Sequence, residues 1–438
     1  MELSRLLSSG EITSKGLLES RRKTIRRHNG TLNAFITVFT GSAIQRPSAG
    51  APLGGITVAV KDNIYTKRHR TTAGSKILRG FVPSIDADVL SRLKSAGAVV
   101  LGKTNLHEFA FGVTNINPHF GDCKNPWNRD RISGGSSGGS AVAVARGMAC
   151  SAIGTDTAGS VRIPAALCGV VGYKPTYGLI SRRGIVPLAW SLDTVGFLTR
   201  GVEDAALLAS LASERREPVK RRPRPGQMKG LKIGVPRNIL DPLADDVGRR
   251  YDEALAAAEN DGARLLSFDL LHFKEASACR SLIAHSEAAS FHRHYFSTRY
   301  SEYGADLRQR LAQGLAIPAA VYLDAQRVRR MLLGYYRSIF DTVDLIALPT
   351  TRIPAPTLKA SKSEETARGI RSALLALTEP FNLFGAPAIT IPCGLTREGL
   401  PVGLQLAGDL YADNRLLSAA LSLERLLPKT LASLQFGD

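Results

Sequence analysis

One lysine and two serines are the residues best suited to chemistry. Lys61 follows an apolar run, residues 56–60, that predicts a buried strand. Ser136 lies in the stretch SGGSSGGS, and Ser160 ends the stretch GTDTAGS. A serine attacks a carbonyl group only when a base removes its proton, and a lysine that burial keeps neutral can act as this base. The three residues therefore predict nucleophilic catalysis that needs no histidine.

Each of these pieces also has a simpler structural interpretation. A lysine at the end of a strand commonly points to solvent, and SGGSSGGS by itself fits a flexible linker or an anion-binding turn. The linker is disfavoured because the stretch runs directly into an Ala- and Val-rich helical run, residues 141–149. A catalytic Lys61 requires burial to lower its pKa from about 10.4 toward about 7 or 8, at a cost of about 1.4 kcal/mol per unit. A chain of 438 residues has a core large enough to maintain this state.

The loop that ends at Ser160 precedes a short helix predicted over residues 161–167. Backbone N–H groups from Thr157 to Ser160 can therefore converge on one point, as in an oxyanion hole. A simple N-cap of the helix by Ser160 is compatible with this arrangement and is individually more common.

Two other motif matches are weaker. Residues 97–104 (GAVVLGKT) fit the phosphate-loop expression, but the residues between the glycines are apolar and predict a strand. Residues 134–138 (GGSSG) fit the nucleophile elbow of α/β-hydrolases, whose histidine follows the serine and the acid along the chain. The last histidine is His294, which would leave 144 residues without a histidine after the triad. Neither match compels a phosphate site or a histidine-based mechanism.

The composition is typical of a globular protein, with 44% hydrophobic and 22% charged residues. No apolar run approaches the ~18 residues that a membrane helix needs, and the charged N-terminus does not resemble a secretory signal. The five cysteines form no metal-ligand spacing and are interpreted as buried thiols in a reducing compartment. The net charge of +19 permits attraction to nucleic acid, but a solvated basic surface is the simpler interpretation. We therefore expect a soluble, cytoplasmic protein without a metal site.

The chain alternates between strand and helix patterns, which predicts an α/β fold. Because the strands are apolar without alternation, the sheet is expected to be covered on both faces. Strands are predicted at 35–39, 56–60, 98–101, 231–235, 264–268, 345–348, 388–391 and 402–406, and helices at 13–28, 86–96, 245–260 and 414–426.

We interpret the chain as one domain, residues 1–438. It has an N-terminal helical segment (1–50), a core that holds the lysine and serine motifs (54–200), and a C-terminal half (231–438) that completes the same sheet. Residues 215–229 are rich in Arg and Pro and predict an exposed connection between the halves, or a loop inside one domain.

The motifs together resemble the amidase signature family, whose members carry GGSSGGS followed by G-[ST]-D-T-x-G-S-[IV]-R-x-P-A. This chain reads GGSSGGS at 134–140 and GTDTAGSVRIPA at 154–165, followed by CGVVGYKPT at 168–176. The stretches PLGGITVAVKDNI around Leu53 and PAITIPCG with GLPVGLQLAG at 387–408 are also similar. The resemblance covers most of the chain and implies a mixed, largely parallel central sheet with helices on both faces.

Carried over by motif position, the family's catalytic triad is Lys61, Ser136 and Ser160, with Ser136 after a cis peptide bond at Gly135. The resemblance implies that neutral Lys61 draws a proton through Ser136 from Ser160, whose oxygen attacks an amide carbonyl and forms an acyl-enzyme. No metal or organic cofactor is needed in this mechanism. Ala110 and Phe111 correspond to a segment that lines the acyl pocket in the family, so they are candidate substrate contacts together with Gly135 and Ser136. Core packing is the alternative for Ala110 and Phe111.

The implied oxyanion hole consists of the N–H groups of Thr157, Ala158, Gly159 and Ser160. Most family members have glycine where this chain has Ala158, and a positive φ angle would strain an alanine there. Asp156 and Arg162, which are also in the motif, are expected to pair and to brace the loop.

The resemblance implies an enzyme that cleaves a small carboxylic amide to the acid and to ammonia or an amine. The alternative is the A subunit of a glutamyl-tRNA(Gln) or aspartyl-tRNA(Asn) amidotransferase, which supplies ammonia from glutamine. Residues 283–330 are more similar to general amidases, including biuret-type hydrolases, and favour a stand-alone amidase. A non-catalytic homologue that binds nucleic acid is disfavoured, because such a protein has no reason to retain a costly buried lysine.

The expected partner is a small-molecule amide substrate, and a homodimer is left open. Nucleic acid is a partner only for the amidotransferase alternative. A membrane partner is not expected, since the chain has no membrane-inserting apolar helix.

Overall fold

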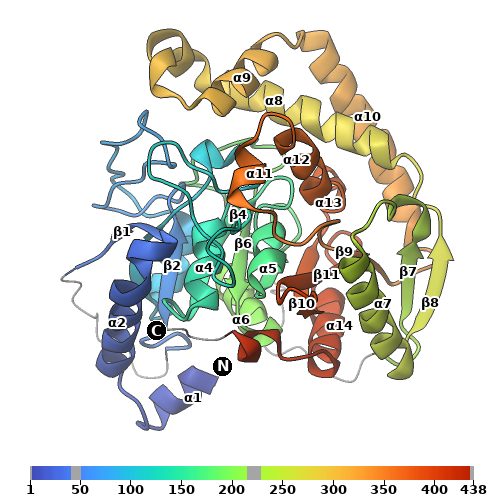
Figure 1. Cartoon of the computed structure of the whole chain (residues 1–438), viewed down its shortest axis with the longest axis horizontal. Helices are drawn as coiled ribbons and strands as arrows, with labels where there is room; N and C mark the ends of the chain where they lie inside the picture. The colour runs from blue at the N-terminus through green and yellow to red at the C-terminus, as the bar shows by residue number, and fades with distance from the viewer. Residues whose placement is uncertain (1, 41–50, 215–227, 435–438) are drawn as a thin grey trace.

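Strands from both halves of the chain pair in one sheet, and helices cover it (Figure 1). The computed structural model describes residues 2–40, 51–214 and 228–434. The eleven strands follow the order β1-β3-β2-β4-β6-β5-β10-β11-β9-β7-β8. Their bounds are β1 Phe35–Val38, β2 Thr57–Lys61, β3 Val99–Thr104, β4 Ser151–Asp156, β5 Val171–Lys174, β6 Thr194–Thr199, β7 Lys232–Pro236, β8 Arg264–Phe268, β9 Leu345–Pro349, β10 Ala388–Leu395 and β11 Pro401–Ala407.

The sheet is mixed. The parallel pairs are β2 with β3 and β4 on one flank, and β7 with β8 and β9 on the other. The remaining neighbours, including the central β6, β5, β10 and β11, are antiparallel. Parallel pairing thus dominates only the two flanks, and antiparallel strands join them in the middle.

Helices pack on both faces of the sheet and bury its apolar residues. One face carries α2 (Ser14–Leu32), α4 (Gly138–Ala145) and α5 (Arg162–Cys168), which share an apolar cluster. The larger cluster contains side chains of α3 (Asp88–Ser95), α6 (Val202–Ala212), α7 (Asp245–Asn260) and α14 (Asp413–Leu426). Every residue of β2, β4, β6, β9 and β11 is buried, as expected for strands covered on both sides. The predicted α/β class and the mixed, helix-covered sheet are confirmed.

A further layer of helices lies beyond one end of the strands (Figure 1). It consists of α8 (Phe273–Thr298), α9 (Ala305–Leu315) and α10 (Ala319–Ile339), and both α9 and α10 pack against α8. The short helices α11 (Leu358–Lys362), α12 (Ala367–Leu375) and α13 (Pro380–Leu383) lie between this layer and the sheet, and α1 covers Glu2–Ser8. In the parts of the chain that the structure describes, no helix is both long and apolar enough to cross a membrane.

Most predicted elements are present with small shifts of their ends. The run 98–101 extends to Thr104 as β3, so the phosphate-loop match is part of a strand, as interpreted. Strands β4, β5 and β6 were not predicted, because Ser, Thr and Gly interrupt their apolar residues. The predicted connection at 215–229 lies outside the described residues, apart from its last two. Four of the five cysteine thiols are buried and Cys150 is half-buried.

Candidate active site

Lys61 is the last residue of β2 and is completely buried. Its Nζ lies 2.7 Å from Ser136 Oγ and donates to Thr155 O at 3.2 Å and to Thr155 Oγ1 at 2.8 Å. Thr155 belongs to β4, which pairs in parallel with β2, and its hydroxyl also accepts a hydrogen bond from Asn63 Nδ2 at 3.1 Å. The alternative of an exposed lysine at a strand end is therefore wrong.

Burial lowers the pKa of Lys61 from 10.5 to about 7, because the ammonium group loses its hydration in the core. The negative charges of Asp156 and Asp193 act in the opposite direction and keep the pKa from falling further. Near neutral pH, a substantial share of Lys61 is therefore uncharged and able to accept a proton. This state is the one that a lysine base requires.

Ser136 lies in the turn before α4, directly after a cis peptide bond at Gly135–Ser136. Its side chain is completely buried, so its hydroxyl meets Lys61 and not solvent. The next residue, Ser137, donates its backbone N–H to Ser160 O at 3.1 Å. This bond holds the two serine loops side by side.

Ser160 lies between β4 and α5 and lines a cleft of about 1840 Å³. Within the described ranges, its hydroxyl has no hydrogen-bond partner, so it can rotate toward Ser136 or toward a bound substrate. The same part of the chain contains no cluster of three or more His, Cys, Asp or Glu arranged to hold a metal ion. The reactive groups at this point are hydroxyl, amine and backbone N–H groups.

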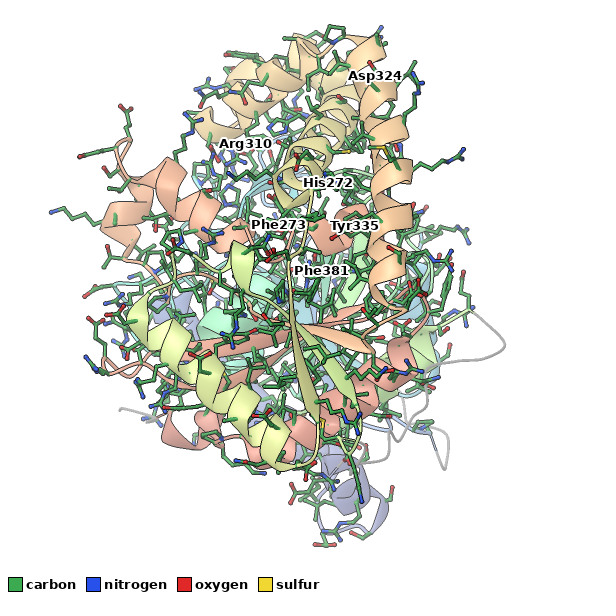
Figure 2. The ribbon with its side chains drawn as sticks, turned by 90° about the vertical axis from the view of Figure 1, so that its right-hand side faces the viewer. His272, Phe273, Arg310, Asp324, Tyr335 and Phe381 are labelled. Carbon is green, nitrogen blue, oxygen red and sulfur yellow. The ribbon has the colours of Figure 1, made fainter. Side chains whose placement is uncertain are left out.

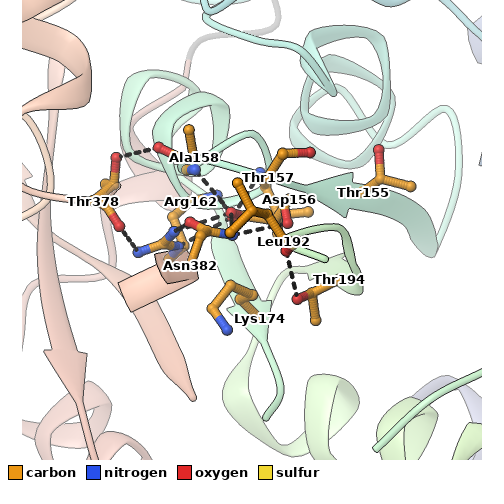
Figure 3. A network of polar contacts seen from close by, with 12 residues as sticks. Thr155, Asp156, Thr157, Ala158, Arg162, Lys174, Leu192, Thr194, Thr378 and Asn382 are labelled. Atoms are coloured by element: carbon orange, nitrogen blue, oxygen red, sulfur yellow. Dashed lines mark hydrogen bonds and ion pairs between the residues drawn. The ribbon is translucent and has the colours of Figure 1, made fainter. Parts of the chain in front are cut away.

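A buried ion pair braces the loop that carries Ser160 (Figure 3). Arg162 Nη2 lies 3.0 Å from Asp156 Oδ1, and both side chains are completely buried. The second aspartate oxygen accepts from Arg162 Nε at 3.1 Å. Although burial alone would raise the pKa of Asp156, the adjacent guanidinium holds it below its ordinary value, so the carboxylate stays charged. The predicted pair is confirmed.

The C-terminal part of the chain completes this network. Arg162 Nη1 donates to Thr378 O at 2.9 Å and to Gln405 Oε1 at 2.6 Å, and Nη2 donates to Asn382 Oδ1 at 2.6 Å. Thr378 Oγ1 donates to Ala158 O at 2.7 Å, inside the loop itself. The loop is therefore fixed from two sides, by its own aspartate and by residues more than 200 positions away.

The oxyanion loop differs from the prediction at Gly159. The N–H of Gly159 donates to Asp156 Oδ1 at 2.7 Å, because an ionised carboxylate is the strongest acceptor nearby. The N–H groups of Thr157, Ala158 and Ser160 have no hydrogen-bond partner among the described residues, and all three residues line the cleft. Gly159 has φ of +121°, whereas Ala158 is absent from the residues with positive φ, so its alanine is not strained.

Asp193 fixes the first residue of this loop. Its Oδ1 accepts from Thr157 Oγ1 at 2.5 Å, and its Oδ2 accepts the N–H groups of Leu188 and Ala189 at 2.9 and 3.2 Å. Burial raises the pKa of Asp193 to about 6, against the effect of these hydrogen bonds. Its contact with Thr157 stabilises the loop that carries Ser160.

The candidate substrate contacts divide into two groups. Ala110 and Phe111 line the same cleft as Ser160, as the acyl-pocket interpretation expects. Ala110 has φ of +60°, a left-handed conformation that is unfavourable for alanine. Gly135 and Ser136 are not among the described residues that line the cleft, and Gly135 packs against the backbone of Asn115.

Several residues of the site were not identified from the sequence. Thr155 lies inside the signature motif and could have been found as a strand neighbour of Lys61. Asp193, Thr378 and Asn382 lie outside the motifs and have no local pattern that points to the site. They reach it only through the pairing of distant strands and the packing of the helices that follow them.

Comparisons with known proteins agree with this geometry. A family model described as Amidase matches residues 17–417. The A subunit of glutamyl-tRNA(Gln) amidotransferase from Symbiobacterium thermophilum is 36% identical over 97% of this chain and 95% of its own length. The chain belongs to the amidase signature family and is an amide-hydrolysing enzyme.

Two solved structures are similar over nearly their whole length. A crystal structure of an amidase is 33% identical, with a TM-score of 0.89, over 98% of this chain and 99% of the other. The crystal structure of the A subunit of glutamyl-tRNA(Gln) amidotransferase from Thermotoga maritima is 36% identical, with a TM-score of 0.85, over 95% of this chain and 93% of the other.

Proposed function

We propose that Ser160 is the nucleophile of this amide hydrolase, with Ser136 as the proton relay and Lys61 as the base. The observation that carries the proposal is the 2.7 Å contact between Lys61 Nζ and Ser136 Oγ, beside a serine that lines the cleft. Neutral Lys61 accepts the proton of Ser136, which accepts the proton of Ser160 as the Ser160 oxygen attacks the carbonyl carbon. The negative charge on the carbonyl oxygen is stabilised by backbone N–H groups of the oxyanion loop.

The tetrahedral intermediate then loses its amine. The C–N bond breaks as the proton held by Lys61 returns through Ser136 to the leaving nitrogen, and the acyl group remains as an ester on Ser160. Water attacks this ester as its proton passes to Ser136 and that of Ser136 passes to Lys61; the ester bond then breaks as a proton returns through Ser136 to Ser160 Oγ, and the acid leaves. The same relay therefore serves both halves of the reaction.

Ammonia release from a panel of small aliphatic, aromatic and urea-type amides tests this proposal. We expect Ser160→Ala and Lys61→Ala to abolish release, because removal of a triad member typically costs several powers of ten in rate. Ser338→Ala, on the outer surface of α10, is the matched control and is expected to retain full activity. Ammonia release that survives Ser160→Ala would overturn the assignment of the nucleophile.

Two more specific functions fit this chemistry, a stand-alone amidase and the A subunit of an amidotransferase, and the relatives favour the amidotransferase subunit over the stand-alone amidase that the sequence alone favoured. A relative named for the A subunit of an amidotransferase matches 97% of the chain at 36% identity, which supports glutamine as the amide and transfer of its ammonia to a partner polypeptide. The amidase structure with a TM-score of 0.89 supports a stand-alone enzyme. We give precedence to the A subunit of an amidotransferase, with the stand-alone amidase as the second candidate.

The two candidates differ in their dependence on a partner. For an amidotransferase component, we expect the chain to copurify with a second polypeptide from its native source and to release ammonia from glutamine faster in that complex than alone. Efficient hydrolysis of small amides by the isolated chain, unchanged in the native preparation, would instead support the stand-alone amidase.

A further inference from the structure

A histidine of the helical layer lines the same cleft as Ser160. His285 lies on α8, and Figure 2 shows this layer of helices, with Arg310 labelled on the neighbouring helix α9. The His285 ring packs edge-on against the ring of Phe111, with 4.9 Å between the two ring centres. Because Phe111 is a candidate acyl-pocket residue that also lines the cleft, His285 lies where the acyl part of a substrate is expected to bind.

Close packing between two helices fixes the position of His285. Helix α9 approaches α8 so closely here that a Cβ on Gly314 would lie 2.3 Å from His285 O and 2.9 Å from the Cβ of Ala289. The His285 side chain itself is half-buried, between this helix contact and the cleft. The histidine therefore reaches the cleft from a firmly packed helix and not from a loop.

A hydrogen bond within α8 determines which ring nitrogen of His285 carries the proton. Nδ1 lies 2.8 Å from Ser281 O, and a carbonyl oxygen can only accept, so Nδ1 carries the hydrogen and donates it. The hydroxyl oxygen of Ser281 is a more distant neighbour of the same nitrogen, at 3.4 Å. In the neutral ring, Nε2 therefore has a lone pair and can only accept a hydrogen bond.

The His285 ring is neutral near pH 7. Burial lowers its pKa from 6.5 to about 4, and the positive charges of Arg280, Arg310 and Arg371 lower it as well. The hydrogen bond to Ser281 O acts in the opposite direction and is the weaker effect. The lone pair of Nε2 is therefore present throughout the neutral pH range.

The structure supplies no donor for this lone pair. Among the described residues, the hydrogen bonds of the His285 side chain involve Nδ1 alone. The adjacent Phe111 ring has no N–H or O–H group, so a donor for Nε2 must come from water or from a ligand in the cleft. A ligand without such a group would displace the water and leave the acceptor unpaired, at a cost in binding.

We propose that His285 Nε2 accepts a hydrogen bond from the substrate, and that the natural substrate is an amide whose acyl part carries an N–H or O–H group. This inference rests on the proposed function and names its substrate class. Hydroxy amides, ureido amides and amino-acid amides belong to the class, and glutamine belongs to it through its ammonium group. Simple alkyl and aryl amides do not, because their acyl parts offer no donor to Nε2.

The first test compares amides that differ only at the end of the acyl chain. Glycolamide, 3-hydroxypropionamide and 4-hydroxybutyramide are each paired with the alkyl amide that has a methyl group in place of the hydroxyl, and with the amino amide that has an ammonium group there. At the chain length that reaches Nε2, we expect a donor to raise kcat/KM about 5-fold over the methyl group, mainly through KM. The hydroxyl and ammonium arms show whether the preferred donor is neutral or charged. Equal kcat/KM for all three end groups at every length would overturn the inference.

His285→Phe is the main variant, because it keeps an aromatic ring against Phe111 and removes both nitrogens. It is expected to lower kcat/KM for the preferred donor amide about 5-fold and to leave the alkyl amide within about 2-fold. Because each amide is compared between wild type and variant, its intrinsic reactivity cancels. His285→Gln, whose side-chain oxygen can accept in place of Nε2, is expected to restore part of the loss. The control is His294→Phe, at an exposed position on the same helix and not among the residues that line the cleft, which is expected to change neither substrate.

NMR of the Ser160→Ala variant with isotopically labelled histidine separates this inference from the proposed function, and it keeps His285 itself intact. Near pH 7, we expect a protonated Nδ1 and an unprotonated Nε2, and an Nε2 signal that moves on addition of the hydroxy amide but not of the alkyl amide. This response, together with a wild type that hydrolyses no amide, would support the inference and contradict the proposed function. A protonated Nε2 in the free protein, the same response to both amides, or an equal loss for both in His285→Phe would overturn the inference and leave the proposed function intact.

Discussion

Lys61 offers the most direct test, because its burial has a calculable consequence for both activity and stability. The side chain is completely buried and its pKa is lowered to about 7. If neutral Lys61 is the base, kcat/KM must fall about tenfold per pH unit below pH 7 and level off above it. The same protonation must also change the free energy of unfolding.

The sign and size of the stability effect follow from the two pKa values. The pKa of Lys61 is about 7 in the folded protein and about 10.4 in the unfolded chain. Between these two pH values, Lys61 is neutral in the folded protein and protonated in the unfolded chain, so the unfolded state binds one more proton. Stability therefore rises with pH through this window, by about 1.4 kcal/mol per unit, and the penalty is fully present only below pH 7. From pH 7 to pH 9 the gain is about 2 kcal/mol, since half of Lys61 is already neutral at the start.

Urea unfolding of the wild type and of Lys61→Met at pH 7, 8 and 9 measures this effect. The variant lacks the titrating group, so the difference between the two unfolding free energies is expected to shift by about 2 kcal/mol in favour of the wild type. Lys174, whose pKa burial also lowers to about 7, is present in both proteins and cancels. Lys359→Met, at an exposed position on α11, is the control and is expected to show no shift. If the difference in unfolding free energy between the wild type and Lys61→Met does not change with pH, Lys61 is not neutral in the folded protein near pH 7. A pH–rate profile that levels off only above pH 9 would refute the same conclusion.

Two further predictions concern residues that contact the proposed triad or its loop. Thr155→Val removes the hydroxyl 2.8 Å from Lys61 Nζ. That oxygen stabilises the protonated amine that forms when Lys61 accepts a proton, so we expect kcat/KM to fall about tenfold without it. For the same reason the pKa of Lys61 is expected to fall, which moves the lower inflection of the pH–rate profile to lower pH. Gly159 has a φ of +121°, and Gly159→Ala would place a Cβ 2.2 Å from the hydroxyl oxygen of Thr378. We expect this variant to release no ammonia and to have a free energy of unfolding that is lower by about 1–3 kcal/mol. Ala158→Gly, one position earlier, is the control and is expected to retain activity; a tolerated Gly159→Ala would contradict the geometry of this loop.

The sequence predicted those contacts of the site whose two partners lie in the same motif. Asp156 and Arg162 lie six residues apart in one motif, so their pairing is predictable from the motif alone. The acceptors Gln405 and Asn382, which complete the arginine's hydrogen bonds, follow it by 243 and 220 residues. No local periodicity encodes such distances, because they depend on which strands become neighbours in the sheet.

The helical layer was missed for a related reason. Helix α8 buries polar and charged side chains, among them Arg280 and Glu287, together with its apolar ones. Arg280 and Glu287 can be buried because each has a polar partner on another segment. Polar residues on the buried face interrupt the continuous apolar stripe on which the prediction of a helix depends. The ion pair between Asp306 and Arg371 is equally hidden from the sequence, since the two residues are 65 positions apart.

A second buried lysine shows why Lys61 is suited to catalysis. Lys103 lies on the adjacent strand β3 and is also completely buried, but its Nζ lies 3.2 Å from Asp62 Oδ1 and close to Ile64 O. Burial lowers the pKa of Lys103, and the nearby carboxylate acts in the opposite direction and favours the charged amine. Lys61 contacts only hydroxyl and carbonyl oxygens, and among the described residues no carboxylate lies within ion-pair distance of it. Two lysines on neighbouring strands are therefore completely buried, and the one without a carboxylate at ion-pair distance is the one placed against a serine.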